Sequence, residues 1–489
     1  MARFNQLLSP AILCVVPFFV SLGLLTSLSP VSAQPDQPHR AVILTDIEAD
    51  PDDTQSLVRL LLYSNQIEIK GLVATTSCWL KADTHPESIQ RIVRAYGQVQ
   101  PTLSLHEEGF PTEEMLMNLI TSGLPVYGME GVGEGKDSEG SDLIIRLLKE
   151  DDERPLWISV WGGVNTLAQS LFRIRSTYSE AEAAHLISKL RVYTISDQDD
   201  SGIWIRNNFP DLFYIVSPGD HYARATWHGI NAVIEGNDNT EISTQWIATN
   251  IQQGHGPLGV EYPDVSWGME GDTPAFLSLI ENGLNDAEHP DYGGWGGRYE
   301  LFTPTFDPEW GGISGVPLEP ETRPIWTDAP AQYTPYLEQA YGRSVRRADR
   351  TFDGNNTSLW RWRDDFQNDF AARMDWCLSA YGEANHPPVP ALSHPQHLTF
   401  TSGESFTLDA FGSTDPDGDH ISFLWFVYPE AGTYTGNFLL GQPENAHKVY
   451  GTAPVVEAPS TIHVILKVTD KGSPRLSRYQ RIILTIEPS

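Results

Sequence analysis

The sequence predicts a mainly parallel α/β sheet flanked by helices, followed by a C-terminal immunoglobulin-like β-sandwich. Short apolar runs alternate with helical segments through the first half of the chain. A proline-rich segment, 386–390, then reads as a linker. Beyond it, short segments alternate apolar and polar residues, as strands with one buried face do. The 489 residues are enough for two or more domains at about 150 residues each.

The α/β part begins at the apolar run 41–45, which is typical of a strand buried on both faces. A helix with a leucine-rich face is expected at 54–64, a strand at 67–75, and a helix with proline in its first turn at 86–96. The alternation continues with strands expected at 156–161, 190–195 and 212–216, and with helices at 142–149, 165–172 and 179–188. Strands that alternate with helices favour parallel pairing with right-handed crossovers.

The second half of the chain changes character twice. Residues 288–352 are rich in glycine, proline and aromatic residues, and we expect irregular structure wrapped over the α/β domain. A long helix is expected at 359–381. Strands of the sandwich are expected at 405–410, 421–427, 461–468 and 479–486. The predicted division is therefore a signal peptide at 1–33, an α/β domain at 34–385 and a sandwich domain at 386–489.

The N-terminal segment predicts export. Arg3 precedes an apolar run from about Leu7 to Leu28, and small residues up to Ala33 offer a cleavage site, so a signal peptide is expected. The alternative is a single membrane anchor, because the apolar run is rather long. With cleavage, the protein is expected to be secreted or periplasmic. Cys78 and Cys377 remain after cleavage, and the sequence leaves open whether they pair.

The charge of the chain excludes some partners. Acidic residues outnumber basic ones by 64 to 32, giving a formal net charge of −32. Binding to nucleic acid or to an anionic membrane surface is therefore not expected, because both require basic patches. The balance suits neutral or cationic ligands and metal sites built from carboxylates.

An acidic cluster follows the first predicted strand. Five of the eight residues from Asp46 to Asp53 are acidic, and a helix is expected directly after them. Ligands of open α/β sheets bind at the carboxyl ends of the strands, where this cluster lies. Because five carboxylates repel one another, a hard cation with oxygen ligands is expected here, Ca²⁺ before Mg²⁺. The alternative is that these acids are solvated and favour the helix N-terminus.

The pattern Asp46-x-Glu48-x-x-x-Asp52-Asp53 resembles the N-terminal Asp-x-Asp-x-x-x-Asp-Asp motif of the nucleoside hydrolases. The resemblance implies that Glu48 and Asp53 bind Ca²⁺ and that Asp52 is the general base that activates a water. Asp46 would be a supporting acid or a further ligand. Glu48 departs from the family pattern, since it has a longer side chain than the family's Asp.

Three later segments also resemble that family. Asn165 stands where the family's metal receives a backbone carbonyl, and Asn207 or Asn208 where the family contacts ribose. Asp272 stands at the last metal ligand. Gly271 replaces the family's His, which protonates the leaving base, so another acid such as His255 or Glu270, or a better leaving group, would be required.

Longer motifs are similar to a narrower bacterial and fungal family. These are Asp50–Ser56, Ile195–Asp200, the Gly/Trp-rich stretch and the sandwich loop Asp415–Asp419. The family is described as cellulose-binding with a nucleoside hydrolase-like domain. The resemblance implies a Ca²⁺-dependent glycosidic hydrolase acting on an N-riboside or related small glycoside. The alternative is a non-catalytic protein that binds a polysaccharide such as cellulose. Relatives of this fold also form homo-oligomers.

Other features are weaker. Asp197 follows a predicted strand and is a candidate for binding sugar hydroxyls, with a solvated turn as the alternative. The alternating Asp415, Asp417 and Asp419 indicate either a second Ca²⁺ site or a plain turn. For Trp295, Trp310 and Trp326 the choice is between stacking on sugar rings and core packing. His221 and His228 are expected to be structural.

Overall fold

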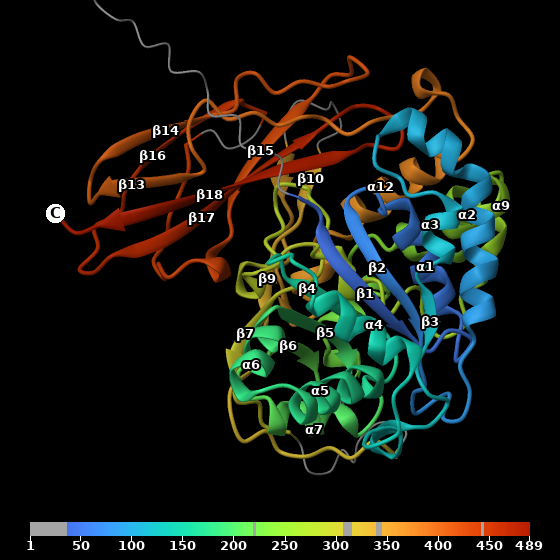
Figure 1. Cartoon of the computed structure of the whole chain (residues 1–489). Helices are drawn as coiled ribbons and strands as arrows, with labels where there is room; N and C mark the ends of the chain where they lie inside the picture. The colour runs from blue at the N-terminus through green and yellow to red at the C-terminus, as the bar shows by residue number, and fades with distance from the viewer. Residues whose placement is uncertain (1–36, 219–221, 307–314, 339–344, 442–444) are drawn as a thin grey trace, which may run out of the picture. The chain divides into compact units, whose positions relative to one another are not determined.

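The computed structural model describes residues 37–489 except 219–221, 307–314, 339–344 and 442–444. Its α/β part contains an eight-stranded sheet in the order β3-β2-β1-β4-β5-β6-β8-β7 (Figure 1). Its strands are β1 (His39–Thr45), β2 (Ile67–Ala74), β3 (Ile120–Ser122), β4 (Leu156–Val160), β5 (Leu190–Ser196), β6 (Phe213–Ser217), β7 (Tyr299–Phe302) and β8 (Ile325–Asp328). All neighbouring strands in it are parallel except β7 and β8. The predicted mainly parallel sheet is confirmed.

Helices cover both faces of this sheet. Along β1, Ala41 and Ile43 belong to one apolar cluster, while Val42 and Leu44 belong to the other. This alternation is the period of a strand, and it buries both faces. The helices α1 (Asp52–Leu62) and α2 (Pro86–His106) contribute to the first cluster. The helices α4 (Glu139–Leu148) and α5 (Asn165–Thr177) contribute to the second (Figure 1).

Further short elements complete the α/β part. They are α3 (Glu113–Met117), α6 (Glu180–Ser188), α7 (Ser201–Asn208), α8 (Thr244–Ile247), α9 (Gly256–Glu261), α10 (Pro274–Leu277), β9 (Ala331–Tyr333), β12 (Phe352–Gly354), α11 (Thr357–Trp360) and α12 (Arg363–Trp376).

Three segments differ from the sequence prediction. Residues 288–352 are not only irregular, since they supply β7 and β8 to the edge of the main sheet and pair β9 with β12. Helix α2 continues ten residues beyond the predicted end at 96, through Pro101, because Val99 and Leu103 are still buried. The long helix predicted at 359–381 is divided into α11 and α12, with the interruption at residues 361–362.

The C-terminal part consists of two sheets. One has the order β13-β18-β17-β15, from His397–Thr401, Ser477–Glu487, Ser460–Thr469 and Ser422–Val427; the other pairs β14 (Ser405–Asp409) with β16 (Lys448–Thr452). Trp425, Leu408 and Val464 are fully buried in a common apolar cluster. This arrangement confirms the predicted β-sandwich.

Helix α12 is joined to strand β18 and its neighbour β17 by buried polar contacts. Lys467 Nζ lies 2.6 Å from Asp365 Oδ1, and Arg478 Nη1 lies 2.6 Å from Asp369 Oδ2. Tyr479 also donates a hydrogen bond to Asp365. Buried ion pairs fix geometry, because removing one partner leaves an unpaired charge. The sandwich is therefore attached to α12 through specific contacts.

The predicted signal peptide lies outside the described residues. Among the described helices, none combines the length and the apolar character required to cross a membrane. Cys78 and Cys377 are both buried free thiols.

Candidate active site

Three carboxylates converge at the carboxyl end of β1. Asp52 and Asp53 form the first turn of α1, which starts seven residues after β1 ends. Asp272 lies just before α10, and one oxygen from each of the three side chains lies within 4.8 Å of the others. Thr45, the last residue of β1, donates a hydrogen bond to Asp53 Oδ1. The carboxyl end of the strand thus fixes the position of this acid cluster, Asp52, Asp53 and Asp272.

Burial and mutual repulsion raise the pKa values of the carboxylates in and beside the acid cluster. Burial raises the pKa of Asp272 well above its usual value, and the negative charges of Asp52 and Asp53 raise it further. Burial followed by neighbouring acids raises the pKa of Asp53 in the same way. Asp46 lies beside the cluster, and burial raises its pKa to about 6. A nearby positive charge would stabilise the ionised form of these groups.

The donor set fits a hard cation. Asp53 and Asp272 are 3% and 4% exposed, so water reaches them little. Asp272 Oδ2 is buried and accepts no hydrogen bond within the part of the chain that the structure describes. Three carboxylates with an unsatisfied buried oxygen match the oxygen ligands that Ca²⁺ takes in proteins.

A cavity of about 560 Å³ opens onto the acid cluster. Its lining includes five acids, Asp46, Asp50, Asp52, Asp53 and Asp272, and five aromatic residues, Trp79, Trp161, Tyr222, Trp227 and Trp267. Trp79 and Trp267 are 52% and 93% exposed, whereas Trp161 is fully buried. This volume is in the range of small-molecule sites, and exposed indole rings suit the apolar faces of sugar rings.

Gly271 lies against the predicted base. A β-carbon at this position would be 2.6 Å from Asp52 Oδ2 and 3.4 Å from the Trp227 ring. Any larger residue would therefore have to displace the Asp52 carboxylate. The absence of a side chain at Gly271 therefore lets the Asp52 carboxylate lie close to the backbone here.

Glu48 does not join the acid cluster. Its backbone has a φ of 78°, in the left-handed region that residues with a β-carbon rarely adopt. The side chain lies against α2, where it accepts a hydrogen bond from Ser88 and is 3.6 Å from Arg91. The structure thus brings two of the predicted metal ligands, Asp53 and Asp272, together with the predicted base Asp52, but it places Glu48 elsewhere.

The remaining predicted residues lie outside the lining of the cavity. Asn165 begins α5, and its amide donates hydrogen bonds to Val126 O and Thr76 Oγ1. Asp197 is held in a bidentate ion pair by the buried Arg206, at 2.7 and 2.8 Å. This pairing corrects the expectation that Asp197 is available to sugar hydroxyls.

Asn207 and Asn208 end helix α7. Asn207 is exposed, and Asn208 donates a hydrogen bond to the Trp204 carbonyl within the same helix. Neither lines the cavity, so the structure does not place them as substrate contacts of the acid cluster.

The two acids considered for the leaving group, Glu270 and His255, both have partners outside the cavity. Glu270 is buried, 2.6 Å from Arg59 Nε, and accepts a hydrogen bond from Tyr262. His255 contacts Asp375 at 3.0 Å. Neither lines the cavity, whereas His228 does. The sequence contains no signal that places His228 in the cavity lining, because it is an isolated imidazole next to Trp227, for which a structural role is expected.

The weaker features are structural where they can be described. Trp295 is fully buried and packs against Phe366, and Trp326 packs against Phe213. Trp310 and His221 lie outside the described residues. Asp417 accepts hydrogen bonds from the backbone and ring of His386, so it anchors the linker.

Comparison with known protein families identifies the family of both parts of the chain. A family model described as "Cellulose-binding Sde182, nucleoside hydrolase-like domain" matches residues 40–299, more than half of the chain. The chain belongs to this family. The C-terminal domain of the cellulose-binding protein Sde0182 matches residues 405–486. The Sde182 family therefore accounts for both parts of the fold.

A solved structure supports the same relationship. A nucleoside hydrolase-related hypothetical protein from Saccharophagus degradans, described as associated with carbohydrate metabolism, is 34% identical with a TM-score of 0.77. The match covers 92% of this chain and 100% of that one. The PKD domain from the KIAA 1837 protein matches 20% of this chain and 88% of that domain at 21% identity, but its TM-score of 0.15 carries no weight. No curated protein matches.

Proposed function

We propose that this member of the Sde182 family is a secreted, Ca²⁺-dependent glycosidic hydrolase of the nucleoside hydrolase type, acting on an N-riboside or related small glycoside. The observation that supports it most is the convergence of Asp52, Asp53 and Asp272 within 4.8 Å at the wall of an aromatic cavity. A purely structural role does not account for buried carboxylates that raise one another's pKa.

The residues have separate roles in this proposal. Asp53 and Asp272 hold the cation, with Asp46 beside them. Bound Ca²⁺ would neutralise these acids, hold sugar hydroxyls and make a nearby water more acidic. Asp52 then removes a proton from the attacking water, because the cation keeps its carboxylate ionised. Trp79 and Trp267 hold the substrate at the exposed side of the cavity.

Departure of the leaving group requires a proton donor other than residue 271. Gly271 has no side chain that could protonate a base, and His228 lies in the cavity lining. An imidazole titrates near neutral pH, so it is suited to donate a proton to a departing nitrogen. His228 is therefore the proposed acid for leaving groups that require protonation.

Hydrolysis of p-nitrophenyl riboside tests the proposal, because nitrophenolate leaves without protonation. We expect turnover in Ca²⁺, loss of turnover in chelator, and loss of at least 100-fold in Asp52→Asn, as for removal of a general base. Glu48→Gln is the matched control, since this acid lies in the same loop but outside the acid cluster. Equal turnover in Asp52→Asn and wild type would refute the assignment of the base.

The second candidate function is carbohydrate binding without catalysis. It is favoured by Gly271, which removes the family's acid, and by the exposed Trp79 and Trp267. Retention of the protein on insoluble cellulose, with no hydrolysis of any tested glycoside, would support this candidate instead.

A further inference from the structure

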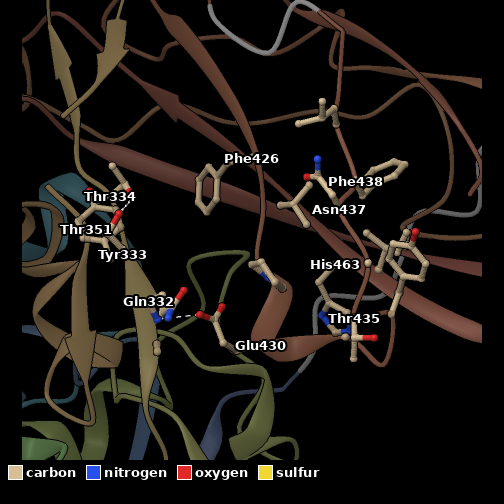
Figure 2. A pocket seen from close by; sticks show the side chains of 18 of the residues that line it. Gln332, Tyr333, Thr334, Thr351, Phe426, Glu430, Thr435, Asn437, Phe438 and His463 are labelled. Carbon is tan, nitrogen blue, oxygen red and sulfur yellow. Dashed lines mark hydrogen bonds between the residues drawn. The ribbon is translucent and has the colours of Figure 1, made fainter. Parts of the chain in front are cut away.

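A second large hollow, of about 670 Å³, lies between the α/β part and the sandwich. Figure 2 shows its two walls, with Gln332, Tyr333, Thr334 and Thr351 on one side. The other wall comes from the sandwich and includes Phe426, Glu430, Thr435, Asn437, Phe438 and His463. We call this hollow the junction groove. It shares no lining residue with the cavity at the acid cluster.

Aromatic rings from both walls line the junction groove. Tyr333 comes from β9, Phe426 from β15, and Phe438 from the loop that follows η9 (Pro429–Ala431). Tyr333 and Phe438 are partly exposed. Rings with accessible faces stack on the C–H faces of sugar rings, which bury apolar area without requiring charge.

An arginine fixes the first of these rings. The Arg361 guanidinium carbon lies 4.8 Å from the Tyr333 ring centre and 4.4 Å from that of Tyr428. Arg361 Nε and Nη1 are buried and make no hydrogen bond within the described residues. Its charge is therefore stabilised mainly by aromatic faces, and it orders Tyr333 as part of the wall.

The polar groups of the junction groove are mostly neutral. Thr334 and Thr351 hydroxyls lie 2.7 Å apart, and Asn437 presents an exposed amide. Glu430 accepts a hydrogen bond from Gln332 N through Oε1, while its buried Oε2 has no partner among the described residues. Amides, hydroxyls and a carboxylate oxygen together donate to and accept from sugar hydroxyls.

We propose that the junction groove binds a segment of a neutral polysaccharide chain. The volume is within the range of ligand sites but larger than one sugar ring requires. The lining offers stacking faces and mostly neutral hydrogen-bonding groups. Its acidic residues, Asp353 and Glu430, outnumber its one arginine, Arg361, whose guanidinium lies against aromatic rings, so the charge balance does not favour an anion. The proposal goes beyond the proposed function, because it assigns the polymer to a place separate from the small-glycoside cavity.

Calorimetric titration of the full chain with the β-1,4-linked hexasaccharides of glucose, xylose and mannose tests this proposal. We expect binding of at least one, weakened about tenfold in Phe438→Ala and in Asn437→Ala. Phe411→Ala is the matched control, because Phe411 is an aromatic residue of the sandwich that is 75% exposed and lies outside the junction groove. It should leave the affinity within twofold of wild type.

Several outcomes would overturn the proposal. These are no binding of any of the three hexasaccharides, an equal loss in Phe411→Ala, or a loss only in Trp267→Ala, which would move the ligand to the acid cluster. If Phe438→Ala does not fold, the test rests on Asn437→Ala, because Asn437 is exposed and its replacement should not disturb the fold. Turnover of p-nitrophenyl riboside is measured in parallel. Its absence from the wild type would reject the proposed hydrolysis and leave the junction groove standing.

Discussion

Asp272→Asn should affect stability in opposite directions with and without Ca²⁺. In chelator, the variant lacks one of three clustered negative charges. Two unit charges 4.8 Å apart repel by about 3.5 kcal/mol at an effective dielectric constant of about 20. Protonation relieves part of this repulsion, as the raised pKa of Asp272 indicates. We therefore expect the variant to be as stable as the wild type in chelator, or more stable by about 1–2 kcal/mol.

With Ca²⁺ the order should reverse. A ligand at 100 times its dissociation constant stabilises a protein by about 2.7 kcal/mol. In a chain of this size, that raises the melting temperature by roughly 3 °C. Asp272 is one of the two carboxylates proposed to hold the cation. Its replacement by an amide removes a full charge from the site, so most of this gain should disappear in Asp272→Asn.

Thermal unfolding at pH 7.5, in chelator and in millimolar CaCl₂, measures both effects. Terbium luminescence excited through tryptophan gives an independent readout of occupancy, since Trp161 and Trp227 line the same cavity. Glu48→Gln serves as the control and should respond to Ca²⁺ as the wild type does. The reasoning is refuted if Asp272→Asn destabilises the protein in chelator, or if its response to Ca²⁺ equals that of the wild type.

Three further predictions concern single side chains. Gly271→Ala should lower turnover of p-nitrophenyl riboside at least tenfold, because its β-carbon would lie 2.6 Å from Asp52 Oδ2; unchanged kcat would show that this carboxylate moves freely. His228→Ala should slow hydrolysis of inosine at least 100-fold and of p-nitrophenyl riboside little; equal losses on both substrates would contradict a leaving-group role. Burial, followed by the charge of Arg481, lowers the pKa of His463 to about 3, so the unfolded chain takes up this proton first as pH falls below about 6.5. Between pH 7 and pH 5, the free energy of unfolding of the wild type should fall by up to about 2 kcal/mol more than that of His463→Gln, as measured by denaturant unfolding. If the free energies of unfolding of the two proteins change with pH in parallel, the prediction is contradicted.

The part of the site that follows one strand was predictable from the sequence. Asp52 and Asp53 come soon after a buried strand and open a helix, and local geometry alone places them at the ligand edge of a parallel sheet. Asp272 is more than 200 residues away in sequence. Only the resemblance to a known motif connected it to them, because no periodicity encodes that distance.

Side-chain direction was not predictable from the same pattern. Glu48 lies in the middle of the acidic segment, yet its left-handed backbone turns the side chain to α2. Asp197 and Asn208 are held by partners close in sequence, Arg206 for Asp197 and Trp204 for Asn208, which the residue pattern alone did not indicate. A motif gives the residue types near a site, whereas single φ values and individual partners decide which side chains reach it.

The tryptophans that line the cavity could not be predicted from the sequence either. The sequence drew attention to the Gly/Trp-rich stretch, but Trp295 is fully buried there. Trp79 and Trp267, which line the cavity, stand in short loops without a distinctive pattern. Strands β7 and β8 were not predicted because each has only four residues and lies in a segment rich in glycine and proline. Exposure of a single aromatic residue depends on the whole fold.

The acid cluster and the junction groove make different physical demands on the protein. A groove that binds a neutral polymer requires aromatic faces and amides. The buried carboxylates of the acid cluster do not contribute to such binding, because they lie outside the junction groove. The carboxylates of Asp52, Asp53 and Asp272 destabilise the folded chain unless a cation is bound, because burial and mutual repulsion act in the same direction. Their convergence in one cavity therefore supports the proposal of a cation-dependent ligand there, whether that ligand is cleaved or only held. A polysaccharide bound at the junction groove would add a second contact rather than replace the first, and the two affinities should respond independently to chelator.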